Sequence, residues 1–348
     1  MPSAEVCAEA RMFDDRAETL TEVFGKTLAS LATDFQELVV LGSGVGDETG
    51  CHHFRRENPD RFLAFGNAER AMMSAAGGLS AIGLLPVVTA LAADCLRAVE
   101  QVRLALAWPK RNVKLVAARP GLDAGADGTA AQALDDIAQF RALPGMTVIA
   151  PADSTETALA TRALIEFDGP VYMRAGLAPG RSFFGAEHRF IVGKGVTLRN
   201  GTDVTLIACG AEVADALEAA DLLAADSVSV CVVNMATIKP LDRDLLATCS
   251  EVTGAVVTVE NHSVIGGLGG AVAEALSSMK SCPLECIGVR DAFGMSGEPS
   301  ELARHFGIGA AAIAEAAHRV LKRKSQRSFS RERAAFRPER RRLSAAPL

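Results

Sequence analysis

The chain has 348 residues, of which 49% are hydrophobic and 22% are charged. This length corresponds to about two domains of ~150 residues, and the composition excludes a wholly disordered chain. The formal net charge of −6 argues against a nucleic-acid-binding protein. The charge is uneven, because residues 322–342 hold ten Lys or Arg and two Glu, so this segment carries +8 and the remainder −14.

Signals for membrane insertion or secretion are not predicted. No run of about 18 apolar residues occurs, so we expect no transmembrane helix and no membrane contact. The first 18 residues are polar and acidic and lack the apolar core of a signal peptide. The eight cysteines are scattered, mostly within apolar runs, which is typical of buried thiols in a reducing compartment. We therefore expect a cytoplasmic protein.

The first half of the chain alternates short apolar runs with longer amphipathic stretches. The runs predict strands at residues 37–41, 85–89, 113–117, 147–150 and 171–174. The amphipathic stretches predict helices at residues 20–32, 68–82, 95–107, 130–141 and 154–166. Continuous apolar strands that alternate with helices indicate a parallel sheet covered by helices on both faces.

A Gly- and Pro-rich segment, residues 175–189, comes next and is predicted to be a linker. A second α/β set follows, with strands predicted at residues 204–208, 228–233, 255–260 and 284–289, and helices at residues 211–225, 242–247, 269–279, 299–306 and 309–322. We therefore predict an α/β fold of two three-layer domains with mostly parallel sheets, at residues 18–178 and 190–322. Residues 323–348 lack apolar periodicity and are predicted to form a basic, disordered tail.

The segment of residues 61–81 contains the most informative acid in the sequence. Glu69 stands at the start of a predicted helix among Ala68, Ala71, Met72 and Met73, so its carboxyl is expected to be buried. Burial raises the pKa of a carboxyl and lets it exchange a proton with a heterocycle. An acid in a first helical turn is also explained as a partner of the helix dipole, and the residues alone leave both interpretations open.

Seven segments carry a resemblance to a known family, in family order and with family spacing. They are FGNAERAM, RAVEQVRLALAWPKRNVKLVA, GLDAGADGTAAQALDDIAQFRALPGMTVIAPAD, GPVYMRAG, ATIKPLD, VENHSVIGGLGGAVAEAL and FGMSGEPSEL. Residues 20–322 resemble the C-terminal half of transketolase, in a divergent version of the split form that two genes encode as two subunits. The resemblance implies a pyrimidine-binding domain for thiamine diphosphate, followed by the transketolase C-terminal domain.

The resemblance also implies a cofactor, a reaction and a partner. Glu69 is implied to be catalytic and to bind the aminopyrimidine of thiamine diphosphate, for transfer of a two-carbon ketol unit between sugar phosphates or related substrates. Relatives hold the diphosphate and Mg²⁺ through a GDG motif and a later Asn, and this chain contains no GDG. We therefore assign no metal ligand to this chain and expect a diphosphate-binding α-type subunit to complete an α₂β₂ heterotetramer.

The chain departs from the family where aromatic side chains are expected beside the cofactor. Family members carry phenylalanines just before the RAVEQ segment, and one of them packs on the aminopyrimidine. This chain has Ala90 and Ala93 in that stretch, and no aromatic residue lies between Pro86 and Trp108. A lost ring stack costs about 0.5–1.5 kcal/mol beyond its buried area. Leu91 is expected to fill part of the gap as a cofactor contact.

Three further residues are implied to bind the substrate. Asp127 matches a family residue that contacts a sugar hydroxyl, and Arg119 and Arg174 match positions near the substrate phosphate. Arg119 stands where transketolases have a histidine and where 1-deoxyxylulose-phosphate synthases have an arginine. Ala131 replaces a family histidine that assists proton transfer or binds substrate hydroxyls. Losing a general acid–base group costs about 10²–10⁴-fold in rate.

Three alternatives remain open at this point. The lost residues are also compatible with a catalytically impaired subunit that regulates or scaffolds its partner. The domain order is shared with the E1β subunit of 2-oxo-acid dehydrogenases, although the strings ALPGMTVIAPAD and HSVIGGLGGAVAEAL fit transketolase better. The arginine at position 119 is also compatible with an activity like that of 1-deoxyxylulose-phosphate synthase.

Overall fold

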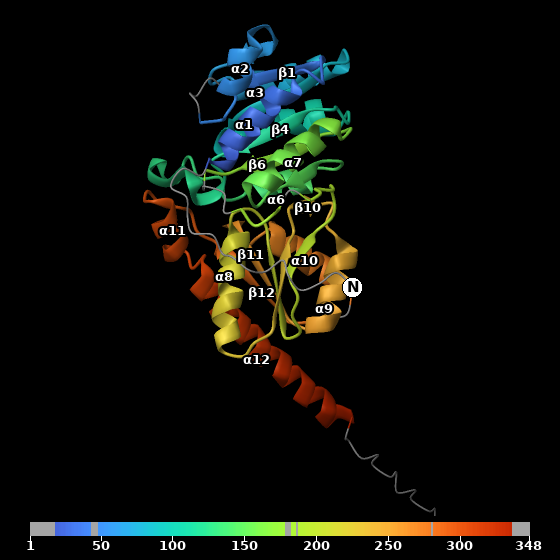
Figure 1. The fold of residues 1–348 in the computed structure, drawn as a ribbon, viewed down its shortest axis with the longest axis vertical. Helices are drawn as coiled ribbons and strands as arrows, with labels where there is room; N and C mark the ends of the chain where they lie inside the picture. The colour runs from blue at the N-terminus through green and yellow to red at the C-terminus, as the bar shows by residue number, and fades with distance from the viewer. Residues whose placement is uncertain (1–17, 43–47, 178–181, 186, 280, 336–348) are drawn as a thin grey trace, which may run out of the picture.

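The computed structural model describes residues 18–42, 48–177, 182–185, 187–279 and 281–335, with side chains up to residue 326. Two α/β domains are stacked along the long axis of the molecule, and we call them the upper and lower domains after their places in Figure 1. The predicted fold class is confirmed, since both sheets are mostly parallel and packed between helices.

The upper sheet in Figure 1 has seven strands in the order β10-β5-β6-β4-β3-β1-β2. Its strands are β1 (Leu38–Gly42), β2 (Phe62–Ala64), β3 (Leu85–Leu91), β4 (Lys114–Ala118), β5 (Thr147–Ile149), β6 (Val171–Ala175) and β10 (Thr237–Lys239). All neighbouring pairs are parallel except β10 with β5. The last strand, β10, therefore comes from the second half of the chain and closes the sheet of the first half.

Helices and helical turns connect these strands. They are α1 (Leu20–Leu31), α2 (His52–Glu57), η1 (Pro59–Arg61), α3 (Glu69–Ala81), α4 (Ala92–Leu96), α5 (Val99–Gln101), the π-helix η2 (Val102–Ala107), η3 (Gly121–Asp127), α6 (Asp136–Ala142) and α7 (Ser154–Glu166). Helix α1 begins where Thr19 accepts a hydrogen bond from the backbone N–H of Glu22 (3.2 Å). Asp153 caps α7 in the same way (2.7 Å), because a short polar side chain replaces a missing intrahelical acceptor.

The lower sheet has the order β12-β11-β8-β9-β7, with only β7 antiparallel to its neighbour. Its strands are β7 (Val196–Arg199), β8 (Val204–Ala208), β9 (Val230–Asn234), β11 (Val256–Ser263) and β12 (Leu284–Val289). The accompanying helices are α8 (Glu212–Ala225), α9 (Arg243–Thr253), α10 (Leu268–Leu276), α11 (Pro299–His305) and α12 (Ala310–Ala335). Figure 1 shows α8 and α12 on one side of this sheet and α9 and α10 on the other.

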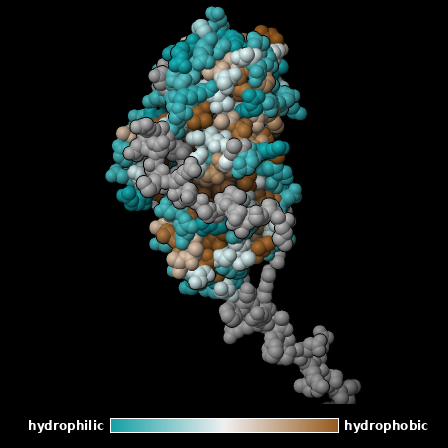
Figure 2. Space-filling model, in the orientation of Figure 1, coloured by the Kyte–Doolittle hydropathy of each residue, from teal (hydrophilic) through white to brown (hydrophobic). Residues whose placement is uncertain are grey.

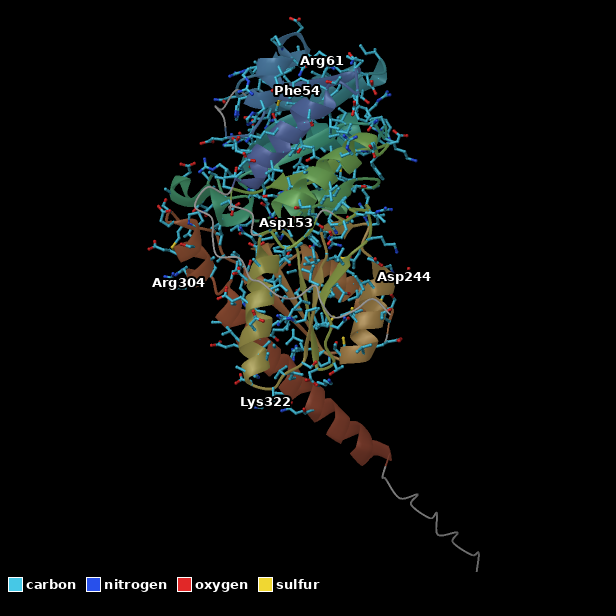
Figure 3. The ribbon with its side chains drawn as sticks, viewed as in Figure 1. Phe54, Arg61, Asp153, Asp244, Arg304 and Lys322 are labelled. Carbon is cyan, nitrogen blue, oxygen red and sulfur yellow. The ribbon has the colours of Figure 1, made fainter. Side chains whose placement is uncertain are left out.

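The two halves share one hydrophobic core. A single cluster of buried side chains includes Phe140 and Tyr172 from the upper part and Met235 and Leu268 from the lower part. The linker is also tied down, since the Asp153 carboxylate accepts the backbone N–H groups of Phe183 (2.9 Å) and Phe184 (3.0 Å). Figure 3 places Asp153 at the junction of the two halves.

Two sequence expectations are wrong in detail, and several short elements were not predicted. The stretch 95–107 is not one helix but α4, α5 and η2, because Ala98 has non-helical backbone angles. The helix expected at 130–141 begins only at Asp136. Ahead of it the chain follows the loop after β12, where the Gln132 amide donates to the carbonyl of Met295 (2.8 Å). The short strands β2, β7 and β10 and helix α2 carried no periodicity long enough to predict them.

The expectation of a disordered tail from residue 323 is also wrong for its first part, because α12 continues through Ala335. Arg323 pairs with Glu285 of β12 (3.2 Å), and Lys324 donates to the carbonyl of Thr253 (2.7 Å). These contacts hold the basic segment to the lower domain without an apolar stripe. Residues 336–348 lie outside the described residues.

No described helix combines the length and apolarity that crossing a membrane requires. On the face shown in Figure 2, hydrophobic patches are scattered among hydrophilic side chains. Scattered apolar side chains of this kind are ordinary on protein surfaces.

Candidate active site

The candidate site lies at the edge of the upper sheet where its parallel strands end. The strand register pairs Gly42 with both Ala64 and Thr89, so the loops after β1, β2 and β3 open side by side. The ends of β3, β4 and β6 are also level, because Leu91 pairs with Ala118. In open α/β sheets, ligands bind outside the carboxyl ends of the strands where the strand order reverses, which here is between β1 and β3.

Glu69 is buried at this edge, as predicted. It is the first residue of α3 and only 7% exposed, while its neighbours Ala68 and Arg70 are exposed. Its carboxylate lies 3.8 Å from Nη1 of Arg97, which is beyond hydrogen-bonding distance. Within the described part of the chain, the structure records no hydrogen bond to this carboxylate. A buried acceptor in this condition can accept a hydrogen bond from a ligand.

A second buried carboxyl, Asp94, lies beside Glu69 and was not anticipated. Asp94 is 5% exposed and pairs with Nη1 of Arg97 at 2.6 Å. Burial raises the pKa of the Asp94 carboxyl, the Arg97 charge lowers it, and the nearby Glu69 charge raises it further. Two buried carboxyls therefore share one guanidinium, whose side chain is 58% exposed. An acid in an otherwise small and apolar run (LAADCL) was the signal that could have identified Asp94.

The stretch that lacks aromatic residues forms the end of β3 and the start of α4. Leu91 is half-buried there, directly before α4. Ala90 and Ala93 are buried at 0% and 8% exposure, and Ala90 belongs to the shared core. Of these three side chains, only that of Leu91 is partly exposed at the end of β3, where a ligand could contact it.

Two of the predicted substrate residues meet directly. Nη2 of Arg119 lies 2.7 Å from the Asp127 carboxylate, and Nη1 lies 3.3 Å from Glu48, a residue that the sequence did not single out. Nη2 also donates to the carbonyl of Ala124 (2.8 Å). Arg119 has a φ of 52°, an uncommon conformation for a residue other than glycine. Backbone strain of this kind clusters at functional sites. Near this group, Ala131 is half-buried.

Arg174, the third predicted substrate residue, lies in a buried ion pair. Its side chain is only 7% exposed, and Nε donates to Asp136 (2.8 Å), with Nη2 also bonded to the same carboxylate. Nη1 donates to the carbonyl of Asn261 in the lower domain (2.9 Å). The guanidinium expected to meet a substrate phosphate is thus committed to a buried junction between the domains.

The buried network around Arg174 includes further titratable groups. Burial alone would raise the pKa of Asp136, but the charge and hydrogen bonds of Arg174 outweigh it and hold that pKa below its ordinary value. Burial lowers the pKa of His262 to about 4, so its imidazole is neutral near pH 7. Burial raises the pKa of Glu260 to about 7, although the backbone N–H groups of Gly269 and Leu268 oppose this shift. The network connects the two domains rather than opening to solvent.

Helix α3, which begins at Glu69, packs against η2, and exposed apolar side chains lie on or directly after these two elements. Trp108 is 81% exposed, Ile82 is 76% exposed and Leu104 is 51% exposed. Gly77 of α3 lies so close to Ala105 of η2 that a Cβ atom would clash with the Ala105 carbonyl. We call these three exposed side chains, which lie on or directly after the two packed elements, the α3–η2 patch (Ile82, Leu104 and Trp108).

Comparisons with known proteins agree with the resemblance found in the motifs. The transketolase pyrimidine binding domain family matches residues 17–176, and the transketolase C-terminal domain family matches residues 193–313. The 6-deoxy-6-sulfo-D-fructose transketolase subunit SqwH of Clostridium sp. (strain MSTE9) is 38% identical over 309 residues, which cover 88% of this chain and 96% of that protein. One subunit of the apulose-4-phosphate transketolase of Phocaeicola vulgatus is 32% identical over 302 residues, covering 86% of this chain and 96% of that protein.

A solved structure gives the same result at the level of the fold. It is described as a split gene transketolase in an inactive beta4 tetramer, and it is 38% identical with a TM-score of 0.81. The match covers 88% of this chain and 99% of that chain. The family predicted from the seven sequence segments is confirmed. The chain belongs to the transketolase family and carries its pyrimidine-binding and C-terminal domains.

Proposed function

We propose that this chain is the β-type subunit of a split transketolase that transfers a two-carbon ketol unit between sugar phosphates or related substrates. The observation that carries the proposal is Glu69, a buried carboxylate at the ligand-binding edge of a pyrimidine-binding domain. Relatives of similar length are named as transketolase subunits for a sulfofructose and for apulose 4-phosphate. These names support the reaction class and leave the sugar of this chain to experiment.

The residues at the site fit thiamine diphosphate on the pyrimidine side. Bound thiamine diphosphate would supply the carbanion chemistry of ketol transfer. Glu69 would hold a proton shared with a ring nitrogen of the pyrimidine, because its carboxylate is buried and has no hydrogen bond among the described residues. Leu91 would provide apolar contact where relatives have an aromatic ring. Arg97 would balance the negative charge of Glu69 and Asp94, since it lies within 4 Å of both carboxylates.

The group around Arg119 would bind the substrate. Arg119 carries a fixed positive charge, and the Asp127 carboxylate beside it can accept hydrogen bonds from sugar hydroxyls. Glu48 competes for the same guanidinium at 3.3 Å, so a substrate phosphate would have to displace this carboxylate. Arg174 would contribute indirectly, by fixing the end of β6 through Asp136.

A partner subunit would complete the active site. The chain has no GDG motif, so the Mg²⁺ and diphosphate ligands would come from an α-type subunit in an α₂β₂ heterotetramer. The α3–η2 patch supports this assembly, because exposed apolar side chains of this size mark association surfaces. The beta4 tetramer of the 38% identical relative is described as inactive, which agrees with a need for a second type of subunit. The assembly would work in the cytoplasm on phosphorylated sugars.

The test is a glycolaldehyde-transfer assay of this chain co-purified with a diphosphate-binding transketolase subunit. Glu69→Ala should lower the rate by about 10²–10⁴-fold, as expected for loss of a proton-transfer group. Glu100→Ala is the matched control, because Glu100 is exposed on the nearby helix α5 and should have no effect. Equal rates for Glu69→Ala and the unmodified complex would refute the role of Glu69.

A regulatory or scaffold role is the second candidate, and one observation favours it. Ala131 lies where a catalytic histidine is expected, and the carboxylates of Glu48 and Asp127 already flank Arg119. Calorimetry separates the two functions. Saturable binding of thiamine diphosphate and Mg²⁺ by the assembled pair, but by neither chain alone, would contradict a scaffold. Decarboxylation of pyruvate by the pair would instead indicate E1β-like or 1-deoxyxylulose-phosphate-synthase-like chemistry.

A further inference from the structure

Two histidines and a glutamate converge between α1 and α2, away from the site described above. Nε2 of His53 lies 2.7 Å from Oε2 of Glu22, and Nε2 of His52 lies 3.9 Å from the same oxygen. One ligand atom from each of the three residues falls within 4.8 Å of the other two. We call this group the α1–α2 cluster (Glu22, His52 and His53).

Adjacent histidines in a helix ordinarily point in directions about 100° apart, so their convergence on one oxygen needs an explanation. The two imidazole rings are 4.0 Å apart and inclined by 38°. Glu22 is in the first turn of α1, whereas the histidines are the first two residues of α2. The cluster therefore joins two helices that are 21 residues apart in the chain, from Leu31 to His52.

The helices that carry the cluster are held firmly against each other. Gly25 of α1 and Gly50, just before α2, approach so closely that a Cβ atom on either would clash with the other's surroundings. Phe54 of α2 is fully buried, and the Arg61 guanidinium lies over its ring at 5.7 Å. Figure 3 shows Phe54 and Arg61 together at the upper end of the molecule. The three side chains are thus mounted on a rigid support, as a preorganised site requires.

The side chains of the cluster are partly buried but remain accessible to solvent. The side chain of His53 is 11% exposed, that of His52 is 21% exposed and that of Glu22 is 33% exposed. Imidazole nitrogens and carboxylate oxygens are ligands of Zn²⁺ at about 2.0–2.2 Å, usually with four ligands in a tetrahedron. Tetrahedral geometry at these bond lengths places neighbouring ligand atoms about 3.3 Å apart. The two separations from Oε2 of Glu22, 2.7 and 3.9 Å, lie on either side of this value, and the ligand atoms of the two histidines lie within 4.8 Å of each other, so side-chain movements of about an ångström would form the site.

We propose that the α1–α2 cluster binds a divalent transition-metal ion of the zinc type, with Glu22, His52 and His53 as protein ligands and water as the fourth. The ion would clamp α1 to α2. Its binding does not depend on the thiamine chemistry proposed above, because none of the three residues belongs to that site.

The experiment uses the full chain, freed of metal with a chelator, and Zn²⁺ alone as the probe. Cys282 and Cys286, the described free cysteines that are not fully buried, are first replaced by serine to remove thiolate binding. Isothermal titration should then give saturable binding of one Zn²⁺ per chain. His53→Ala and Glu22→Gln should each weaken binding at least about tenfold, because each removes one ligand of the ion.

His318→Ala is the matched control. His318 is a partly exposed histidine that also pairs with a carboxylate, Asp226, at 3.1 Å, but it has no second histidine beside it. Its loss should leave Zn²⁺ affinity unchanged. Glu22→Gln retains the size of the side chain, so it tests the metal site even if His53→Ala fails to fold. Equal Zn²⁺ affinity in Glu22→Gln and the parent, or no saturable binding by the parent, would overturn the proposal.

Discussion

Replacing Asp136 with alanine should lower the free energy of unfolding by about 3–5 kcal/mol, because it breaks a buried ion pair and leaves one charge behind. Asp136 is fully buried, and Arg174 is 7% exposed, so water cannot replace the lost carboxylate. The carboxylate accepts bonds from Nε and Nη2 of Arg174 and from the hydroxyl of Tyr172. Hydrogen bonds to charged groups contribute about 1.5–3 kcal/mol each, and three coupled bonds lose less than their sum of about 4.5–9 kcal/mol, which is compatible with this range.

Urea denaturation followed by far-ultraviolet circular dichroism measures this loss. The matched control is Asp221→Ala, which removes the exposed partner of Arg199 and should change stability by no more than about 0.5 kcal/mol. The double variant Asp136→Ala/Arg174→Met should regain part of the loss, because it leaves no unpaired buried charge. The contribution has a defined pH range. Since the pKa of Asp136 is held below its ordinary value, the ion pair stabilises fully above about pH 4 and its contribution is lost as pH falls further.

The reasoning would be refuted if Asp136→Ala and Asp221→Ala had the same small effect. That outcome would mean that water or a rearranged side chain neutralises Arg174, and that the junction between the domains is not sealed. A loss in Asp136→Asn close to that of Asp136→Ala would identify the charge of the carboxylate, rather than its shape, as the stabilising feature.

Three further predictions concern other parts of the molecule. Burial lowers the pKa of Lys114 to about 7, so between pH 7 and about 10.4 the unfolded chain binds one proton more than the folded chain. The free energy of unfolding should therefore rise with pH over this range, by up to ~1.4 kcal/mol per pH unit. Urea titrations at pH 7, 8 and 9 should show this rise in the parent but not in Lys114→Met. Burial raises the pKa of Asp94 and the Arg97 charge opposes this, so Arg97→Gln, which leaves Asp94 without its ion-pair partner, should destabilise the fold by about 1 kcal/mol at pH 8 in the same assay. Trp108→Glu should preserve the fold, because the ring is 81% exposed, but it should weaken association with the partner subunit, as measured by analytical ultracentrifugation. The control is Val252→Glu on α9, where the side chain is 58% exposed, and it should leave this association unchanged.

The elements that the sequence predicted well are those with long, regular apolar patterns. Strands β8 and β12 and helix α7 have the predicted bounds, because continuous apolar strands and a helix with its own Asp153 cap are specified locally. The start of α6 could not be predicted, since the chain before it follows a loop more than 150 residues away through Gln132. Strand β10 has three residues and takes its place only because β5 offers an open edge.

In the candidate site, too, features set by local sequence could be predicted, whereas contacts between distant segments could not. Burial of Glu69 followed from small apolar neighbours in the sequence, and the same rule would have indicated Asp94. The partners of Arg174 could not be predicted, because Asp136 lies 38 residues away and the carbonyl of Asn261 belongs to the other domain. The pairing of Arg119 with Glu48 likewise depends on two loops that meet only at the edge of the folded sheet.

The strand β10 has a consequence for how this protein can be divided. It belongs by sequence to the lower domain, yet it supplies the last hydrogen-bonded strand of the upper sheet, beside β5. A fragment that ends in the linker would leave one edge of β5 unpaired, since its other edge pairs with β6, and exposed strand edges recruit other chains. The upper domain, although it holds the whole match to the pyrimidine-binding family, therefore depends on the lower domain to remain free of edge-to-edge aggregation. A subunit of this kind therefore cannot be cut between its two sheets without exposing this edge.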